Sequence, residues 1–503
     1  MGDTERQARP KRPNSAELIE AVFDAGSWVS WDEQPLTVAD PGSDYAAALA
    51  KAAERAGTDE SIVTGEGRIG GHRAAAIVGE FQFLAGSIGR AAAERIVRAF
   101  ERATDEGLPL FAAPTSGGTR MQEGTPAFVT MVKITAAVGA FKAKRLPYIT
   151  YLRHPTTGGV FASWGSLGHV TVGEPGATIG FLGARVYEAL YGQPFPEGVQ
   201  TAENLWTNGL LDAVLPVEDL RDMATRFLGL VLAPVEQPAV ADVPREDLPD
   251  TPAWDSITRS RNPDRPGVRT LLRYGADEVI PLFGTGSGEW DRSLFLALVR
   301  FEGVPCVVLG QDRRAEAEAT KPLSPSGLRV ARRGMRLAQE LGIPLVSLID
   351  TAGAALSKEA EEGGMAGEIA RCLAELVALS EPTVCVLLGQ GTGGGAIALM
   401  PADRVICAEH SWLSPLPPEG ASAILYRTAD RAPEIAAQQQ VRSADLLRNG
   451  IVDRIVAEHP DAAEEPVEFS RRMAQAIAHE LTDLTRMARE ERLSARHTRY
   501  REL

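Results

Sequence analysis

The sequence predicts an α/β fold built from two related domains. Each half of the chain alternates buried-strand segments, glycine-rich turns and amphipathic helices, and the halves share landmarks at an offset of about 235 to 241 positions. In folds of this kind the functional site lies at the loops that follow the strands. A length of 503 residues also exceeds what one hydrophobic core usually serves, so two domains are expected.

The repeated elements are expected at equivalent places in the two halves. Apolar residues at helical spacing predict helices over 88–103 and 328–341, and a charged amphipathic helix is predicted over 468–501. Continuous apolar runs predict strands, which are Leu108–Ala113 and Pro147–Leu152 in the first half and Ile343–Ile349 and Thr383–Leu388 in the second. Four landmarks recur in the same order, namely Gly107–Leu110 with Gly342–Leu345, Ser116–Gly118 with Ala352–Ala354, Gly158–Gly159 with Gly394–Gly395, and the segment from Gly209 with that from Gly450.

The repeat also places the boundary between the halves. Residues 234–266 are rich in Pro and Asp and poor in large apolar side chains, which is typical of a surface linker. We therefore expect a disordered tail at 1–20, a first domain at 21–233, the linker at 234–266 and a second domain at 267–503.

Composition excludes several classes of function. A formal net charge of -15 argues against nucleic-acid binding, which needs clustered excess Lys and Arg. We recognise neither a secretory signal nor a later apolar run of bilayer length, so we expect no membrane association and a cytoplasmic location. The four cysteines have no metal-ligand spacing and are interpreted as buried thiols in a reducing compartment; they are Cys306, Cys372, Cys385 and Cys407.

Two glycine-rich turns are the most informative motifs. The turn with Gly158 and Gly159 and the turn with Gly394 and Gly395 each follow a predicted strand and precede a predicted helix. Backbone N–H groups at the start of a helix stabilise a developing oxyanion, and glycine leaves room for the ligand. Paired glycines also occur in tight turns that bind nothing, so both interpretations stay open.

Other catalytic patterns are missing from the sequence. Neither glycine turn has Walker A spacing, or a GxGxxG followed by an acidic residue, which argues against nucleotide binding. No GxSxG or HExxH sequence occurs. The isolated histidines are interpreted as structural; they are His72, His154, His169 and His410. Catalysis by backbone groups is therefore favoured.

Long motifs in both halves match a known family. In the first half they are GGHRAAAIVGEFQFLAGSIG (70–89), SGGTRMQEG (116–124), HPTTGGVFASWGSLG (154–168) and EPGATIGF (174–181), and in the second SPSGLRVARRGM (324–335), LGQGTGGGAIAL (388–399) and SPLPPEGASAILY (414–426). From about Phe23 to Pro216 the chain resembles the carboxyltransferase beta subunit of bacterial acetyl-CoA carboxylase, and from about Pro305 to Pro460 it resembles the alpha subunit more loosely. As a whole it is similar to actinobacterial proteins that fuse the two subunits.

The resemblance implies a fold and a site. It implies two crotonase-like domains of the ClpP/crotonase superfamily, each made of repeated β-β-α units, assembled as a homodimer or a trimer of dimers. It also implies that Gly158 and Gly159 form one oxyanion hole and that Gly394 and Gly395 form another. The substrate-binding residues implied are Ser116, Gly117, Gly118 and Arg120 on the coenzyme A side, and Arg329, Gly353, Ala354 and the Ala396 N–H on the biotin side.

The implied activity is transfer of a carboxyl group from carboxybiotin, held on a separate carrier protein, to the α carbon of a short acyl-CoA. Conversion of acetyl-CoA to malonyl-CoA in fatty acid biosynthesis is expected, with a biotin carboxylase and a biotinyl carrier protein supplied by other chains. A biotin-independent malonyl-CoA or malonate decarboxylase and a non-catalytic assembly subunit remain alternatives.

The sequence departs from the family pattern at three places. No cysteine precedes Cys306, so the four-cysteine zinc ribbon of many beta subunits is not expected. The turn at Gly353 continues with Ala354 and Ala355 where the alpha subunit usually has a Pro-Gly pair, and Gln390 stands where it has an acidic residue. The resemblance on the biotin side is therefore weaker at the Gly353 turn, and binding details are not transferred to Gln390.

Overall fold

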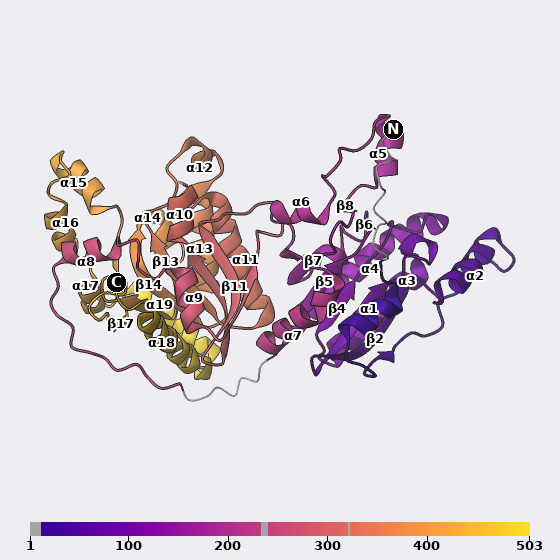
Figure 1. Ribbon diagram of the computed structural model, residues 1–503, viewed down its shortest axis with the longest axis horizontal. Coiled ribbons are helices and arrows are strands. Elements are labelled where there is room, and N and C mark those ends of the chain that lie inside the picture. The colour runs from indigo at the N-terminus through magenta and orange to yellow at the C-terminus, as the bar shows by residue number, and fades with distance from the viewer. Residues whose placement is uncertain (1–11, 233–239, 320–321, 503) are drawn as a thin grey trace, which may run out of the picture. The chain divides into compact units, whose positions relative to one another are not determined.

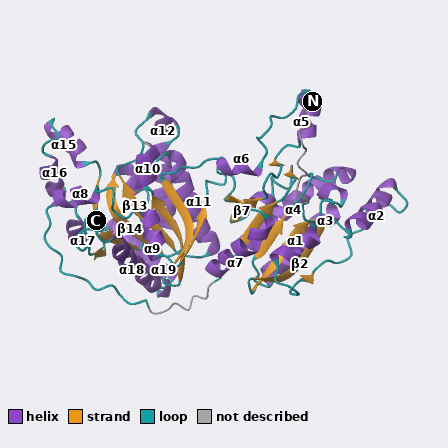
Figure 2. Cartoon of the chain, in the orientation of Figure 1, coloured by secondary structure: helices purple, strands orange, loops and turns teal. Residues whose placement is uncertain are grey.

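The computed structural model describes residues 12–232, 240–319 and 322–502. The chain divides into two compact units, one of residues 1–207 and 213–228 and the other of residues 208–212 and 229–503 (Figure 1). Each unit is built around its own β-sheet, which is covered by helices (Figure 2).

The sheet of the first unit begins with antiparallel strands and continues with parallel ones. Its order is β1-β2-β3-β4-β5-β7-β9, antiparallel from β1 to β3 and parallel from β3 to β9. The strands are β1 (Val29–Ser30), β2 (Ile62–Ile69), β3 (His72–Gly79), β4 (Leu110–Ala113), β5 (Tyr148–Leu152), β7 (Val170–Gly173) and β9 (Ala213–Val214), and β6 (Thr156–Thr157) pairs separately with β8 (Ile179–Gly180).

Helices α3 and α4 supply the apolar layer against this sheet. Phe100 of α3 meets Phe141 of α4 edge-to-face at 5.6 Å between ring centroids, and Tyr148 of β5 at 5.4 Å. The helices are α1 (Ser15–Val22), α2 (Asp44–Ala56), α3 (Arg90–Asp105), α4 (Gly124–Ala143), α5 (Ala184–Tyr191), α6 (Ala202–Thr207) and α7 (Leu220–Val231), with 3-10 turns η1 (Leu84–Gly86), η2 (Met121–Glu123), η3 (Trp164–Ser166) and η4 (Val217–Asp219).

The second unit repeats the same plan. Its sheet has the order β10-β11-β12-β13-β14-β15-β17, antiparallel from β10 to β12 and parallel from β12 to β17, with β16 paired to β14. Strands β11 and β12 are followed by the short α10 (Arg313–Ala319) and by α11 (Pro325–Leu341), which corresponds to α3 after β2 and β3, so each unit contains a β-β-α succession. The strands are β10 (Glu278–Leu282), β11 (Leu294–Phe301), β12 (Val304–Gln311), β13 (Leu345–Thr351), β14 (Thr383–Thr392), β15 (Arg404–Ala408), β16 (Trp412–Ser414) and β17 (Arg454–Val456).

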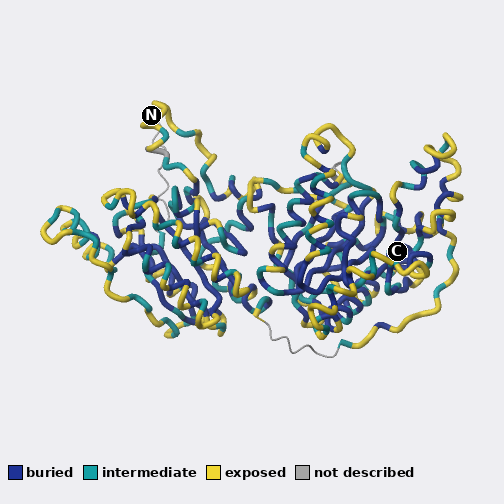
Figure 3. The backbone as a smooth tube through the Cα atoms, turned by 180° about the vertical axis from the view of Figure 1, so that it is seen from behind, coloured by how far each residue is buried: buried dark blue, intermediate teal, exposed yellow. Residues whose placement is uncertain are grey.

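Buried residues of the second unit concentrate on these strands and on the helices packed against them (Figure 3). Its central helix α11 starts with Pro325 and ends at Gly342, whose φ of +68° suits glycine. The helices are α8 (Ala253–Ser260), α9 (Val268–Gly275), α10 (Arg313–Ala319), α11 (Pro325–Leu341), α12 (Lys358–Glu362), α13 (Met365–Ala378), α14 (Gly393–Ile397), α15 (Pro418–Tyr426), α16 (Ala432–Gln438), α17 (Ser443–Arg448), α18 (Pro466–Arg486) and α19 (Arg489–Arg501).

The predicted tail at 1–20 is partly ordered. Residues 1–11 lie outside the described residues, but Ser15–Val22 form α1. Asn14 and Glu17 make a reciprocal capping box at its start, and Leu18 and Ile19 are buried. This helix was missed because it is short and follows a charged N-terminal sequence that contains no apolar run.

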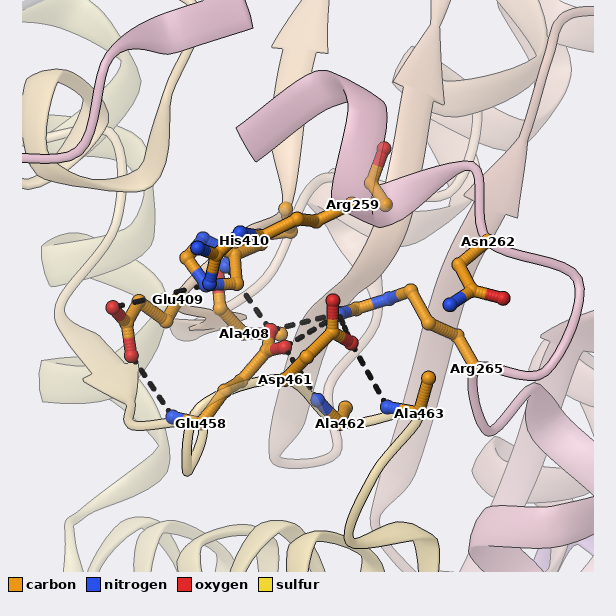
Figure 4. Close-up of polar contacts among 12 residues, drawn as sticks. Arg259, Asn262, Arg265, Ala408, Glu409, His410, Glu458, Asp461, Ala462 and Ala463 are labelled. Carbon is orange, nitrogen blue, oxygen red and sulfur yellow. Dashed lines mark hydrogen bonds and ion pairs between the residues drawn. The ribbon is translucent and has the colours of Figure 1, made fainter. Parts of the chain in front are cut away.

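The predicted linker at 234–266 also packs onto the second unit over its last part, while 234–239 lies outside the described residues. Residues 253–260 form α8, and Arg265 is only 2% exposed. The Arg265 guanidinium binds the carboxylates of Glu458 and Asp461, and His410 N donates to Glu458 Oε1 at 3.0 Å (Figure 4). Ion pairing thus anchors a segment whose few large apolar residues suggested a surface linker.

Two further expectations need correction. The C-terminal helix is broken at Met487, whose extended backbone separates α18 from α19. The 23-residue segment Met121–Ala143 contains an 18-residue window of mean hydropathy 1.3 and is long and apolar enough by length and composition to span a membrane, although no such run was expected. Its apolar residues occupy more than one face, because Ile134 and Phe141 are buried in the core while Phe128 and Val132 are exposed.

Candidate functional site

The first glycine turn follows β5 and β6 in the first unit. Gly158 has a φ of +63°, and its N–H donates to Gly180 O at 3.1 Å. Within the described part of the chain, the Gly159 N–H has no hydrogen-bond acceptor. No α-helix follows directly, because the chain continues through turns to η3, so the predicted strand-glycine-helix order is wrong here. The free donor is the Gly159 peptide group, and a Cβ there would lie 3.4 Å from Met131 Cγ.

The turn at Ser116–Gly118 lies directly beside this first glycine turn. Thr157 N donates to Ser116 O at 3.0 Å, and a Cβ on Gly158 would lie 3.6 Å from Gly118 Cα. Ser116 is 1% exposed, and its Oγ accepts from Gly118 N at 3.0 Å. The structure therefore brings the predicted Ser116, Gly117 and Gly118 to the predicted glycine pair, with the serine hydroxyl used inside the turn.

Arg120 was expected to shape the coenzyme A side, but its side chain is fully buried. Its guanidinium binds Glu60 in a bidentate ion pair and donates to Ser87 O at 2.8 Å. Arg120 thus holds the loop after Gly118 against the unit's interior. It positions the turn from the interior, with no exposed surface of its own.

The second glycine turn begins α14 in the second unit. Gly394 and Gly395 belong to the first turn of this short helix, so their N–H groups have no acceptor within it. A Cβ on Gly395 would lie 3.1 Å from Ala354 N, which shows how closely the Gly353–Ala354 turn approaches. The predicted Gly353, Ala354, Gly394 and Gly395 therefore come together, and the buried Ala396 follows directly in the helix.

A cavity of about 620 Å³ opens beside the Gly353–Ala354 turn. Its wall includes Gly353, Ala354 and Gln390, together with the partly buried Glu316 of α10 and three arginines. The arginines are Arg261, Arg313 and Arg314. Sequence reasoning missed Glu316, since an acidic residue in an Ala-rich helical stretch carries no motif that marks it.

Arg329 was expected on the biotin side, but its side chain binds residues of neighbouring segments of the second unit. It pairs with Glu289 at 2.6 Å and Glu368 at 3.3 Å, and it donates to Gly363 O at 2.7 Å. These contacts join α11 to the start of α13. Arg329 therefore supports the fold near the site and is not among the residues that line the cavity.

The histidines and cysteines take structural places. His154 Nδ1 accepts from Thr178 N and His169 Nδ1 accepts from Tyr148 N, each at 3.0 Å. The four cysteines are buried and unpaired, as expected, and burial raises the pKa of the Cys385 thiol to about 12. Thiolate chemistry at neutral pH is therefore not favoured.

Comparison with known proteins decides the family. The family model described as the carboxyl transferase domain matches residues 21–493. The chain belongs to the carboxyl transferase family. The carboxyl transferase chain is 58% identical over 493 residues to the probable biotin-dependent acyl-coenzyme A carboxylase beta3 subunit of Mycobacterium tuberculosis, covering 98% of this chain and 99% of the relative. It is 36% identical over 468 residues to the acetyl-coenzyme A carboxylase carboxyl transferase subunits beta/alpha of Salinispora arenicola, covering 89% of this chain and 83% of the relative.

Solved structures confirm the predicted α/β, crotonase-like fold for this carboxyl transferase. The transcarboxylase 12S hexamer core superposes with a TM-score of 0.75 at 19% identity, covering 95% of this chain and 91% of that one. A single-chain, multi-domain long-chain acyl-CoA carboxylase gives a TM-score of 0.70 at 19% identity, covering 92% of this chain and 46% of that one. At these identities the likeness concerns the fold alone.

Proposed function

We propose that this carboxyl transferase moves a carboxyl group from carboxybiotin, held on a separate carrier protein, to the α carbon of a short acyl-CoA, with acetyl-CoA to malonyl-CoA as the first candidate. The family membership and the similarity to acyl-CoA carboxylase subunits support the reaction class. The observation that carries the proposal is the pair of glycine turns, one in each unit, that present backbone N–H groups without an internal acceptor.

Each turn would stabilise one carbonyl oxygen as negative charge develops on it. The free N–H of Gly159 would hold the thioester oxygen of the acyl-CoA while its α carbon becomes an enolate, and Gly158, whose N–H donates to Gly180 O, would shape the turn. Gly394 and Gly395, with the Ala396 N–H, would hold the ureido oxygen of biotin. Carboxybiotin would release carbon dioxide as its N–C bond breaks, the freed ureido nitrogen would take the substrate's α-proton, and the enolate carbon would bond to the carbon dioxide. Positioning and electrostatic stabilisation then suffice, and the protein supplies no general base.

The proposed partners are a biotin carboxylase and a biotinyl carrier protein, and the proposed assembly is a homodimer or a trimer of dimers in the cytoplasm. Self-association is supported by the exposed apolar side chains of α4, since an exposed patch of this kind marks an interaction surface. Phe128 is 62% exposed, Val129 54% and Val132 70%.

The experiment is the reverse reaction with purified protein. Malonyl-CoA and free biotin are supplied without ATP, and acetyl-CoA formation is followed. Acetyl-CoA that forms only with biotin present supports carboxyl transfer. Acetyl-CoA that forms equally without biotin would instead show a decarboxylase, and none with malonyl-CoA or longer carboxylated acyl-CoA thioesters would favour a non-catalytic assembly subunit.

A further inference from the structure

A carboxyl group outside the glycine turns lies on the wall of the cavity in the second unit. Glu316, on α10, lines this space of about 620 Å³ together with Gly353, Ala354 and Gln390. No step of the proposed reaction uses it, although a carboxylate normally avoids a partly buried wall without a cationic partner. Within the described residues, Glu316 has no ion pair.

Thr351 links the Glu316 carboxyl group to the Gly353–Ala354 turn, which approaches the second glycine turn. Thr351 Oγ1 donates toward both carboxyl oxygens, at 3.2 and 3.3 Å, and accepts from Gly353 N at 3.1 Å. The same Gly353–Ala354 turn approaches Gly395, with Ala354 N 3.1 Å from the Cβ position. Glu316 is therefore placed one hydroxyl away from the Gly353–Ala354 turn, which in turn packs against Gly395.

The charges around Glu316 favour its neutral form. Asp350 of β13, Asp312 after β12 and Asp291 before β11 all act on it, and burial is the largest influence. Together they raise the pKa of Glu316 to about 8.

The three arginines that line this cavity either lie near other carboxylates or are exposed to solvent. Arg313 lies 3.5 Å from Asp350, Arg261 pairs with Glu419 at 2.6 Å, and Arg314 is exposed. The raised pKa of Glu316 favours a carboxylic acid on the wall of the cavity at neutral pH. Thr351 Oγ1 has one proton, which Gly353 O can also accept at 3.1 Å, so it can donate to only one Glu316 oxygen and the O–H of the acid can serve a ligand.

We propose that Glu316 is a substrate-contacting carboxylic acid, whose O–H donates a hydrogen bond to the transferred carboxyl group of carboxybiotin, and whose ionised form excludes that anion. The inference rests on the proposed function. The proton stays on Glu316 throughout, so the residue recognises the carboxylated ring and takes no part in bond breaking. A neutral acid used as a donor in a site of low polarity is an established chemical device.

The kinetic test compares Glu316→Gln, Glu316→Ala and the exposed control Glu464→Gln in transfer from malonyl-CoA to free biotin between pH 6.5 and 9.5. For the natural protein and the control, kcat/KM for biotin should fall about tenfold per pH unit above about pH 8, because it reports the ionisation of the free enzyme. Glu316→Gln keeps a neutral donor, so it should lose this falling limb and retain activity at pH 7. Glu316→Ala should be slower at pH 7 and equally flat.

An infrared difference spectrum between the natural protein and Glu316→Gln supplies a readout that needs no activity. A protonated-carboxyl band should be present at pH 7 and disappear with a midpoint near 8. Absence of this band at pH 7, or an unchanged falling limb in Glu316→Gln, overturns the inference while leaving the proposed function standing. No biotin-dependent transfer by the natural protein overturns the proposed function itself, and the inferred ligand with it.

Discussion

Arg120 donates to both carboxyl oxygens of Glu60, and neither side chain is more than 3% exposed. This pair joins the segment before β2 to the loop that follows Gly118 and so fixes the turn beside Gly158. An arginine in the sequence SGGTR suggested a ligand for an anionic substrate, but the buried geometry makes it an internal anchor. A substitution at this pair should therefore change stability more than substrate binding.

Replacing Arg120 with Met should destabilise the first unit strongly. The change leaves the Glu60 carboxylate buried without its cation, which typically costs about 3–5 kcal/mol of unfolding free energy. Urea unfolding followed by tryptophan fluorescence measures this cost. The exposed pair of Arg98 with Glu33 is the control, since Arg98→Ala should cost less than about 1 kcal/mol. A similar small loss for Arg120→Met would contradict the anchoring role.

Adding a side chain to either glycine turn should slow transfer without unfolding the protein. Gly159→Val fills the space beside the free N–H, and Gly395→Val presses on Ala354 N, 3.1 Å from the Cβ position. Loss of one oxyanion donor typically costs about two to three powers of ten in rate. Gly139→Ala in α4 and Gly420→Ala in α15 have room for a methyl group and should leave the rate unchanged. Normal transfer by both Val variants would refute the two oxyanion holes.

Periodicity and repeats predicted most of the fold, because burial imposes them on the sequence. The apolar runs around Leu110 and Leu345 became β4 and β13, and both glycine pairs reached their expected partner turns. Ion-paired and capped segments were not predictable in this way. The segment that follows α8 is held in place because Arg265 binds Glu458, nearly two hundred residues away in the sequence. The position of Glu316 likewise depends on the contact of α10 with Thr351 of β13. Such long-range polar contacts leave no local pattern.

A charge on the exposed face of α4 should reduce self-association. Val132 is 70% exposed on an otherwise apolar stretch, so Val132→Glu would place a carboxylate in any interface formed there. Light scattering coupled to size-exclusion chromatography should show a shift to smaller species at equal protein concentration. Val29→Glu, at a position 56% exposed on β1, is the matched control and should keep the natural mass. Equal masses for all three proteins would show that α4 is not an oligomer contact.

The Arg265 network should make the stability of the second unit depend on acid pH. Burial alone would raise the pKa of Glu458, but the hydrogen bonds and charge of Arg265 outweigh it and hold that pKa below its usual value. A carboxyl group with a depressed pKa stabilises the fold above its unfolded pKa of about 4.5, and this stabilisation is lost as pH falls through the folded value.

Arg265→Met removes the cation and should lower the unfolding free energy by about 3–5 kcal/mol at pH 7. The difference between the two proteins should shrink as pH falls from 7 toward 3, because protonation of Glu458 removes the buried charge that Arg265 pairs with. Thermal unfolding at both pH values measures it, and Arg471→Met, which breaks an exposed pair with Glu468, should behave like the natural protein at both. A difference that is the same at pH 7 and pH 3 would show that Arg265 acts by packing and not by its charge.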